Sequence, residues 1–161
     1  MATLEAPATF AAVWERSVDR RADSLFLVFE GSDGLVSSWT YEQFDGLVSR
    51  VAATLVANGV EPGSPVHMAL ANCPAFVAVW LAVIRLGAWV VTSDPMGGKA
   101  ELRGHIGRTR PVVGICASSR AGVYLSACGP LRVIEVEEQD PALRAFGGDQ
   151  VSSWTTPAPT D

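Results

Sequence analysis

Apolar residues recur along this chain with helical and strand spacing in turn. Helical spacing covers ranges 9–21, 40–58, 72–86, 98–110 and 120–127, and apolar runs typical of strands cover 25–30, 35–40, 65–70, 89–93, 111–117 and 131–136. Turn residues between the first two strands predict a β-hairpin. Apolar strands joined by helices predict right-handed crossovers. The predicted fold class is therefore α/β: a mostly parallel sheet flanked by helices on both faces, preceded by an N-terminal helix and β-hairpin.

The helix after the hairpin carries the clearest boundary signals. Thr40 and Gln43 form a Thr-x-x-Gln capping box, and Trp39 before it is placed to pack on Phe44. Asn58-Gly59 supplies a left-handed stop. One apolar stripe lies between these signals, so this helix should bury a single face.

The following helix is apolar nearly all round. Asn72 is predicted as its N-cap, and Pro74 suits the first turn. The longest uncharged apolar stretch, 73–84, is too short to cross a bilayer and stops at Arg85. The apolar face at 76–86 fits either a protein core or a membrane contact.

Composition describes a globular chain of 161 residues, 48% hydrophobic and 18% charged, with a net charge of −5. Lys99 is the only lysine and no run of basic residues occurs, which argues against nucleic-acid binding. Glu5 and Pro7 stand where a signal peptide would carry a basic start and an apolar stretch. The three cysteines fit no zinc or disulfide pattern, so a cytoplasmic location is expected.

A phosphate loop is suggested by Gly97-Gly98-Lys99, but the full pattern fails. Ser93 stands where the first glycine belongs, and Ala100 stands where a Mg²⁺-binding hydroxyl is required. The favoured interpretation is a turn before a helix. The chain also lacks the Gly-x-Gly-x-x-Gly pattern of a classical dinucleotide site.

Titratable candidates are few. His67 lies in a predicted strand and His105 in a predicted helix, and neither has a Cys, Asp or Glu at ligand spacing. Both are interpreted as packing or surface residues, and no metal or catalytic site is predicted. Cys73 sits at a predicted helix start, where the dipole lowers a thiol pKa, but a buried inert thiol is favoured.

Two residues are candidates for a pocket or an interface. Asn72 and Asp94 each follow a predicted parallel strand, and ligands of open α/β sheets bind at that carboxyl edge. The competing interpretation of Asp94-Pro95 is a plain turn before the next helix, and it is favoured.

Five segments together carry a resemblance to a known family: 39–44, 55–59, 72–76, 80–82 and 86–88. Their amino-acid sequences resemble the N-terminal region of adenylate-forming acyl-CoA synthetases. Within that superfamily they are closest to the crotonobetaine/carnitine–CoA ligase-like and fatty-acid–CoA ligase branch. The resemblance covers roughly residues 10 to 137, and its motifs are structural signatures rather than catalytic ones.

The resemblance implies a two-step ligase that uses ATP, Mg²⁺ and CoA. ATP activates a carboxylate as an acyl-adenylate with release of pyrophosphate, and the CoA thiolate then attacks the acyl carbon. The family's phosphate loop, adenine- and Mg²⁺-binding segment, ribose-binding Asp, hinge and catalytic Lys map onto no residue here, and Lys99 does not match the catalytic lysine. No catalytic, cofactor-binding or metal residue is therefore assigned.

These observations give two hypotheses. In the first, residues 1–138 form an α/β subdomain of an AMP-binding domain, and 139–161 form a linker toward the ATP-phosphate loop of a longer enzyme. Its partners would be the remainder of that enzyme or other copies of the chain, through exposed apolar surface. In the second, the chain is a stand-alone α/β ligand-binding or interaction module.

Overall fold

The computed structural model describes residues 9–147. Its helices are α1 (Phe10–Arg21), α2 (Tyr41–Ala57), α3 (Pro74–Arg85), α4 (Lys99–Thr109) and α5 (Ala121–Cys128), with a short 3₁₀ turn at Ser118–Arg120. Its strands are β1 (Leu25–Glu30), β2 (Val36–Thr40), β3 (Pro65–Ala69), β4 (Trp89–Thr92), β5 (Val113–Ala117) and β6 (Arg132–Val136).

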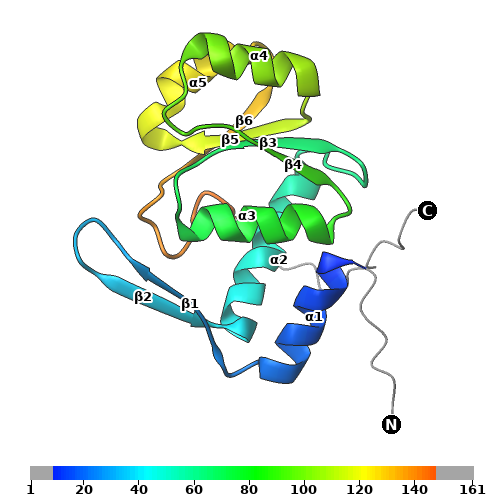
Figure 1. Ribbon diagram of the computed structural model, residues 1–161, viewed down its shortest axis with the longest axis vertical. Coiled ribbons are helices and arrows are strands. Elements are labelled where there is room, and N and C mark those ends of the chain that lie inside the picture. The colour runs from blue at the N-terminus through cyan, green and yellow to red at the C-terminus, as the bar shows by residue number, and fades with distance from the viewer. Residues whose placement is uncertain (1–8, 148–161) are drawn as a thin grey trace.

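Four of the strands form one parallel sheet. Their order is β4-β3-β5-β6, and every neighbouring pair is parallel. Helices α2 and α3 cover one face, and α4 and α5 cover the other (Figure 1). The predicted fold class is confirmed.

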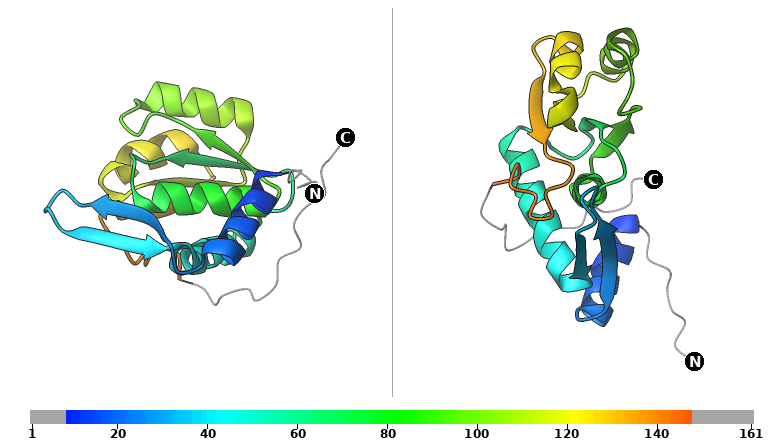
Figure 2. Two further views of the ribbon diagram at one scale, coloured as in Figure 1. Left: turned by 60° about the horizontal axis from the view of Figure 1, so that its bottom comes forward. Right: turned by 90° about the vertical axis from the view of Figure 1, so that its left-hand side faces the viewer.

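The hairpin stands apart from this sheet. Strands β1 and β2 pair antiparallel as a two-stranded sheet, which projects from the side of the molecule in Figures 1 and 2. Its inner side packs on the main core through Phe26 and Phe29, while Leu25, Val28 and Val36 are exposed.

Helix α2 begins as its sequence predicts. The Thr40 hydroxyl accepts from the Gln43 backbone N–H at 3.2 Å, and the Gln43 side chain accepts from the Thr40 N–H at 2.9 Å. The Trp39 ring packs edge-on against Phe44 with centroids 5.8 Å apart. Gly59 adopts the left-handed conformation with φ of 89° and ends the helix.

The start of α3 differs from the prediction by one residue. Cys73, not Asn72, is the N-cap, and its side chain makes no capping hydrogen bond. Pro74 takes the first helical position, where its missing N–H costs nothing. The residue before a proline is driven to extended geometry, and Cys73 has it, with φ of −148° and ψ of 167°.

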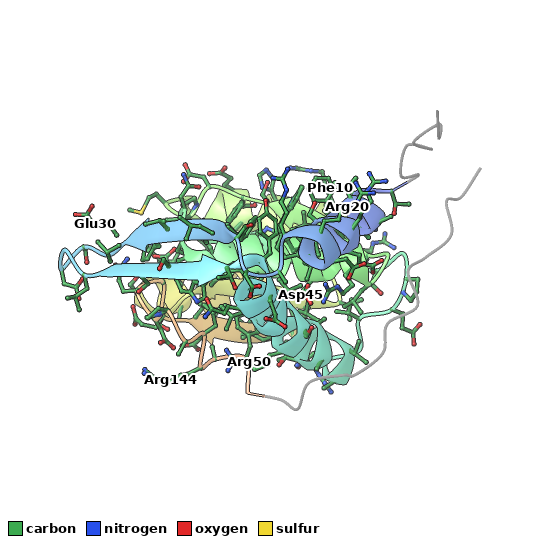
Figure 3. All side chains as sticks on the ribbon, turned by 90° about the horizontal axis from the view of Figure 1, so that it is seen from below. Phe10, Arg20, Glu30, Asp45, Arg50 and Arg144 are labelled. Atoms are coloured by element: carbon green, nitrogen blue, oxygen red, sulfur yellow. The ribbon has the colours of Figure 1, made fainter. Side chains whose placement is uncertain are left out.

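The segment after β6 contains no helix or strand within 139–147, yet it closes the core. Leu143 and Phe146 are 1% and 0% exposed. Arg50 of α2 donates to the Ala142 carbonyl, and Gln139 accepts from the Ser32 N–H in the hairpin turn at 2.8 Å. Figure 3 places Arg50 and Arg144 on the same side of the molecule. The rest of the predicted linker, 148–161, lies outside the described residues.

Candidate functional site

The carboxyl edge of the sheet holds both candidate residues, but in different surroundings. Asn72 follows β3 and Asp94 follows β4, and both are exposed. The two strands are neighbours, so the loops that carry the residues are adjacent. Asn72 lines a groove that Asp94 does not line.

The groove beside Asn72 is mainly apolar. It has a volume of about 330 Å³ and lies between β1 and the start of α3. Leu27, Val28, Phe76 and Val77 form much of its wall. Apolar walls with one amide at the rim fit an apolar segment or ligand.

Asp94 closes a turn rather than facing a pocket. Its carboxylate accepts from the Met96 backbone N–H at 2.8 Å. Arg120 donates to the Met96 and Gly97 carbonyls at 3.3 and 3.2 Å, which fixes this loop from the other side. Gly98 is the N-cap of α4. The interpretation of Gly97-Gly98-Lys99 as a turn before a helix is confirmed.

A chain of four polar side chains runs from the interior behind this loop. His67 on β3, 0% exposed, contacts the Tyr124 hydroxyl through Nδ1 at 2.6 Å and Ser93 Oγ through Nε2 at 2.8 Å. Ser93 Oγ also contacts His105 Nδ1 at 2.6 Å. The residues come from β3, the position just after β4, α4 and α5, so this network of side chains ties the α4–α5 layer to the sheet.

The Tyr124 hydroxyl determines which group donates in each hydrogen bond of this network. Its hydroxyl is buried, and a buried O–H that donates to nothing loses a full hydrogen bond. His67 Nδ1 is the acceptor within reach, so His67 carries its proton on Nε2 and donates to Ser93. Ser93 then donates to His105 Nδ1. His67 must stay neutral for this arrangement to hold.

His67 should therefore make the fold sensitive to acid. Burial, and next the charge of His105, lower the pKa of His67 from 6.5 to about 4. Below pH 6.5 the unfolded chain binds a proton that the folded chain refuses, so stability falls as pH drops from 6.5 toward 4. The full effect is about 3 kcal/mol, and urea unfolding at a series of pH values measures it.

His67→Met is the control for that titration. Methionine fills similar volume without a titrating group, so stability should change less between pH 7 and 5 than in the unaltered chain. Equal pH slopes in the two proteins would assign the acid effect to carboxylates instead.

The three cysteines are buried and free. Burial raises the pKa of Cys73 and raises that of Cys116 to about 12. Cys73 is buried, as interpreted, and a raised pKa favours the protonated, unreactive thiol at neutral pH. Among residues 9–147 no group of three or more His, Cys, Asp or Glu side chains is placed to hold a metal ion.

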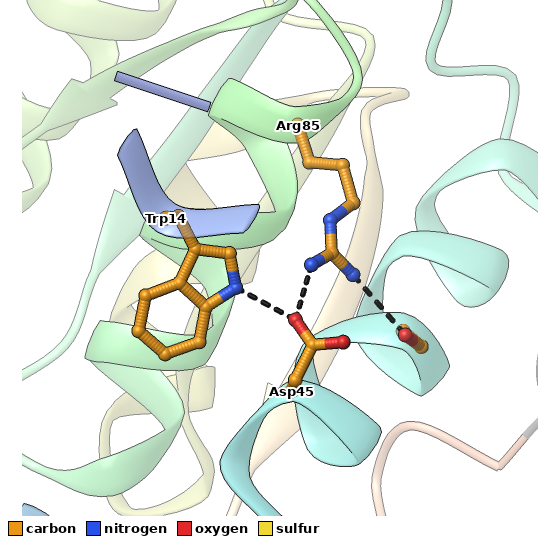
Figure 4. A network of polar contacts seen from close by, with 4 residues as sticks. Trp14, Asp45 and Arg85 are labelled. Atoms are coloured by element: carbon orange, nitrogen blue, oxygen red, sulfur yellow. Dashed lines mark hydrogen bonds and ion pairs between the residues drawn. The ribbon is translucent and has the colours of Figure 1, made fainter. Parts of the chain in front are cut away.

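A second polar network joins the three helices on the other face (Figure 4). Arg85 of α3, 5% exposed, pairs with Asp45 of α2 and donates to Ser49 Oγ at 3.1 Å. Asp45 also accepts from the Trp14 indole of α1 at 2.7 Å. This network joins side chains from three helices at the core, which indicates a structural role.

A family model described as AMP-binding enzyme matches residues 14–157. The chain therefore belongs to the AMP-binding enzymes, the family of the adenylate-forming acyl-CoA ligases. The crotonobetaine/carnitine–CoA ligase of Citrobacter koseri is 29% identical over 79 residues, 49% of this chain and 15% of that enzyme. The enzyme of the same name from Salmonella paratyphi A is 28% identical over 79 residues, again 49% and 15%. The matched part is thus a small share of these relatives.

Solved structures repeat the fold at low sequence identity. A benzoate CoA ligase from Burkholderia xenovorans superposes with a TM-score of 0.77 at 16% identity, covering 93% of this chain and 30% of that one. The N-terminal domain of FACL13 from Mycobacterium tuberculosis gives 0.74 at 19% identity, covering 90% and 38%. The architecture is therefore that of the N-terminal part of such ligases. No helix within the described residues has the length and apolar character to span a membrane.

The sequence predicted neither the hydrogen-bonded network around His67 nor the part that segment 139–147 takes in the core. The members of the network around His67 are spread over 58 positions, and none stands at ligand spacing from another. One usable signal was present, a histidine inside an otherwise apolar strand, since such a residue must find partners when buried.

Proposed function

We propose that this chain is the N-terminal part of an ATP-dependent acyl-CoA ligase and acts there as a scaffold. The observation that carries the proposal is the match over residues 14–157 to a family whose matched relatives are several times longer. The complete enzyme would use ATP, Mg²⁺ and CoA to convert a carboxylate to its acyl-CoA, through an acyl-adenylate. Three buried free thiols suit a reducing cytoplasm.

By itself the chain is proposed to be inactive in adenylation. Transfer to a carboxylate requires fixed positive charge around the phosphates and a positioned Mg²⁺. Lys99 and Arg120 lie near the carboxyl edge, but Lys99 is exposed at the start of α4 and Arg120 is committed to backbone carbonyls. The two together form no preorganised triphosphate site.

An ATP–pyrophosphate exchange assay tests the inactivity. The 161-residue chain, incubated with labelled pyrophosphate, ATP, Mg²⁺ and a series of carboxylates, should give no exchange above a boiled sample. A complete acyl-CoA ligase assayed in parallel shows that the conditions support turnover. Exchange that depends on one of the carboxylates would place adenylation chemistry within these residues and overturn the proposal.

The partner surface is proposed to be the hairpin and the groove beside it. Leu25, Val28 and Val36 are 62%, 54% and 64% exposed, next to the apolar wall of the groove. Clustered exposed apolar side chains mark interaction surfaces. In the complete enzyme the remainder of the chain would cover them, and in the isolated chain a second copy would do so.

Self-association of the isolated chain is therefore expected. Light scattering should show mass above that of the 17.0 kDa monomer as concentration rises. Val28→Thr with Val36→Thr should shift the mass toward the monomer, because both residues lie on the exposed hairpin. Leu125→Ser is the matched control, because Leu125 is an exposed apolar residue of α5, away from the hairpin. Equal effects of the two changes would remove the hairpin from the interface.

A stand-alone binding module is the second candidate, favoured by the groove beside Asn72. Calorimetric titration with ATP·Mg²⁺, and separately with a medium-chain acyl-CoA, distinguishes the two. Saturable heat that Phe76→Ser abolishes would support the module. Absence of heat from both ligands supports the scaffold.

A further inference from the structure

A second pocket lies at the opposite, amino edge of the parallel sheet. It has a volume of about 790 Å³ and forms where α2, α4 and α5 end and β5 and β6 begin. Val56, Ile106 and Val112 supply part of an apolar wall, and Arg110 and Arg132 stand in the lining. No lining residue is acidic.

Both arginines are exposed and carry uncompensated charge. Within residues 9–147, no ion pair or side-chain hydrogen bond engages the guanidinium group of Arg110 or Arg132. Arg85 and Arg120 differ, because each is committed to internal acceptors. The two pocket arginines come from different elements, so the fold brings two free guanidinium groups to one cavity.

The backbone at Arg110 is held in an unfavourable conformation. Arg110 follows α4 in the left-handed region, with φ of 48° and ψ of 57°, and precedes Pro111. Glycine is the usual residue there, because a side chain at positive φ crowds the backbone and destabilises the fold. Such strain concentrates at functional positions. An arginine at this place spends stability to put a charge beside the pocket.

The surrounding charge points the same way. Residues 103–132 contain five basic side chains and no acidic one, although the whole chain has a net charge of −5; of the five, only Arg120 is bound at the opposite, carboxyl edge. This stretch builds the α4–α5 layer on one face of the sheet (Figure 1). Three helix C-termini at the pocket each contribute about half a negative charge. The two full positive charges of Arg110 and Arg132 exceed that sum.

We propose that the amino-edge pocket binds the phosphate group of a small phosphate ester, with the ester's apolar portion against Val56, Ile106 and Val112. Guanidinium groups match phosphate oxygens in paired, planar hydrogen bonds. A phosphate monoester carries nearly two negative charges at neutral pH, which suits two arginines better than a carboxylate does. This site is separate from the groove and the carboxyl edge, and it does not rest on the ligase function.

Phenyl phosphate is a suitable probe, with benzoate and inorganic phosphate as comparison ligands. Titration of the ¹⁵N-labelled 161-residue chain at pH 7.5 should give saturable amide shifts centred on Val112 and Arg132. Phenyl phosphate should bind at least fivefold more tightly than benzoate, which has one charge fewer. It should also bind more tightly than inorganic phosphate, which lacks the apolar part.

Three variants locate the site. Arg132→Gln and Arg110→Gly should each weaken phenyl phosphate binding at least tenfold. Arg103→Gln, an exposed arginine of α4 outside the pocket, should change it less than twofold. Arg110→Gly should unfold at the same or a higher urea concentration because it relieves the strained backbone. Weakened binding by that variant would then not reflect lost folding.

Four results would overturn the site. These are shifts that never saturate, equal losses with Arg103→Gln and Arg132→Gln, unchanged binding by Arg110→Gly, or benzoate affinity equal to that of phenyl phosphate. The second would indicate a diffuse positive field, and the last would remove phosphate from the assignment.

Discussion

Phe146→Ala should destabilise the fold by about 3–5 kcal/mol, the usual cost of removing a fully buried phenylalanine. Phe146 is 0% exposed and packs in the main core with Leu143. Both residues come from a segment without helix or strand, and loss of the Phe146 ring would leave a cavity in the main core. Urea unfolding followed by circular dichroism measures the change.

Two truncated chains test the same contribution of segment 139–147 to the core. Compared with a chain ending at Gly147, one ending at Glu138 should lose at least as much stability as Phe146→Ala removes. Ala145→Ser, at an exposed neighbouring position, is the matched control and should stay within about 0.5 kcal/mol. Equal unfolding midpoints for the two truncations would show that 139–147 is a linker with no part in the core.

The contrast between α2 and this segment explains what sequence could predict. Helix α2 is predicted by local signals, the Thr40–Gln43 capping box at its start and Gly59 at its end. Each signal involves residues only a few positions apart. Leu143 and Phe146 have no periodicity around them, because a turn brings each into the core and Leu143 itself adopts a positive φ of 49°. Their burial depends on a core built by residues far away in the sequence, and Arg50 of α2 binds the same segment at the Ala142 carbonyl.

The polar networks show the same limit. The Asn72 cap was predicted from a general preference, and the stronger constraint imposed by Pro74 moved the cap to Cys73. His67 was interpreted from its spacing as a packing or surface residue and is buried. Its partners Ser93 and Tyr124 are set by strand order and helix packing. Parallel strand order follows from tertiary contacts that a single sequence does not display. A role for Asn72 and Asp94 in a pocket or an interface stays a prediction.

Asp45→Ala should cost about 3 kcal/mol, because it leaves a buried guanidinium with one weak partner. Arg85 is 5% exposed, and without Asp45 the acceptor that remains for its guanidinium group is the Ser49 hydroxyl. Loss of one member of a buried pair usually costs 3–5 kcal/mol. Asp45 is 25% exposed, so water entering the vacated space limits the loss to the lower end.

Further variants separate the contribution of charge to the stability of the Asp45–Arg85 pair from the contribution of packing. Asp45→Asn keeps an acceptor for the Trp14 indole but removes the negative charge, so it should cost less than Asp45→Ala. The double change Asp45→Leu with Arg85→Met should recover most of the stability, since apolar replacement of both partners of a buried pair is often neutral. Arg144→Ala, which removes an arginine that is 81% exposed, should change stability by less than about 0.5 kcal/mol.

Urea unfolding of all four variants, followed by tryptophan fluorescence, tests the interpretation. If the double change is as unstable as Asp45→Ala, the network does more than satisfy its own buried charge. Arg85 would then be needed to set the angle between α2 and α3, a specificity that an apolar pair does not supply. If instead Asp45→Ala matches Arg144→Ala, water solvates Arg85 and the pair contributes little to the fold.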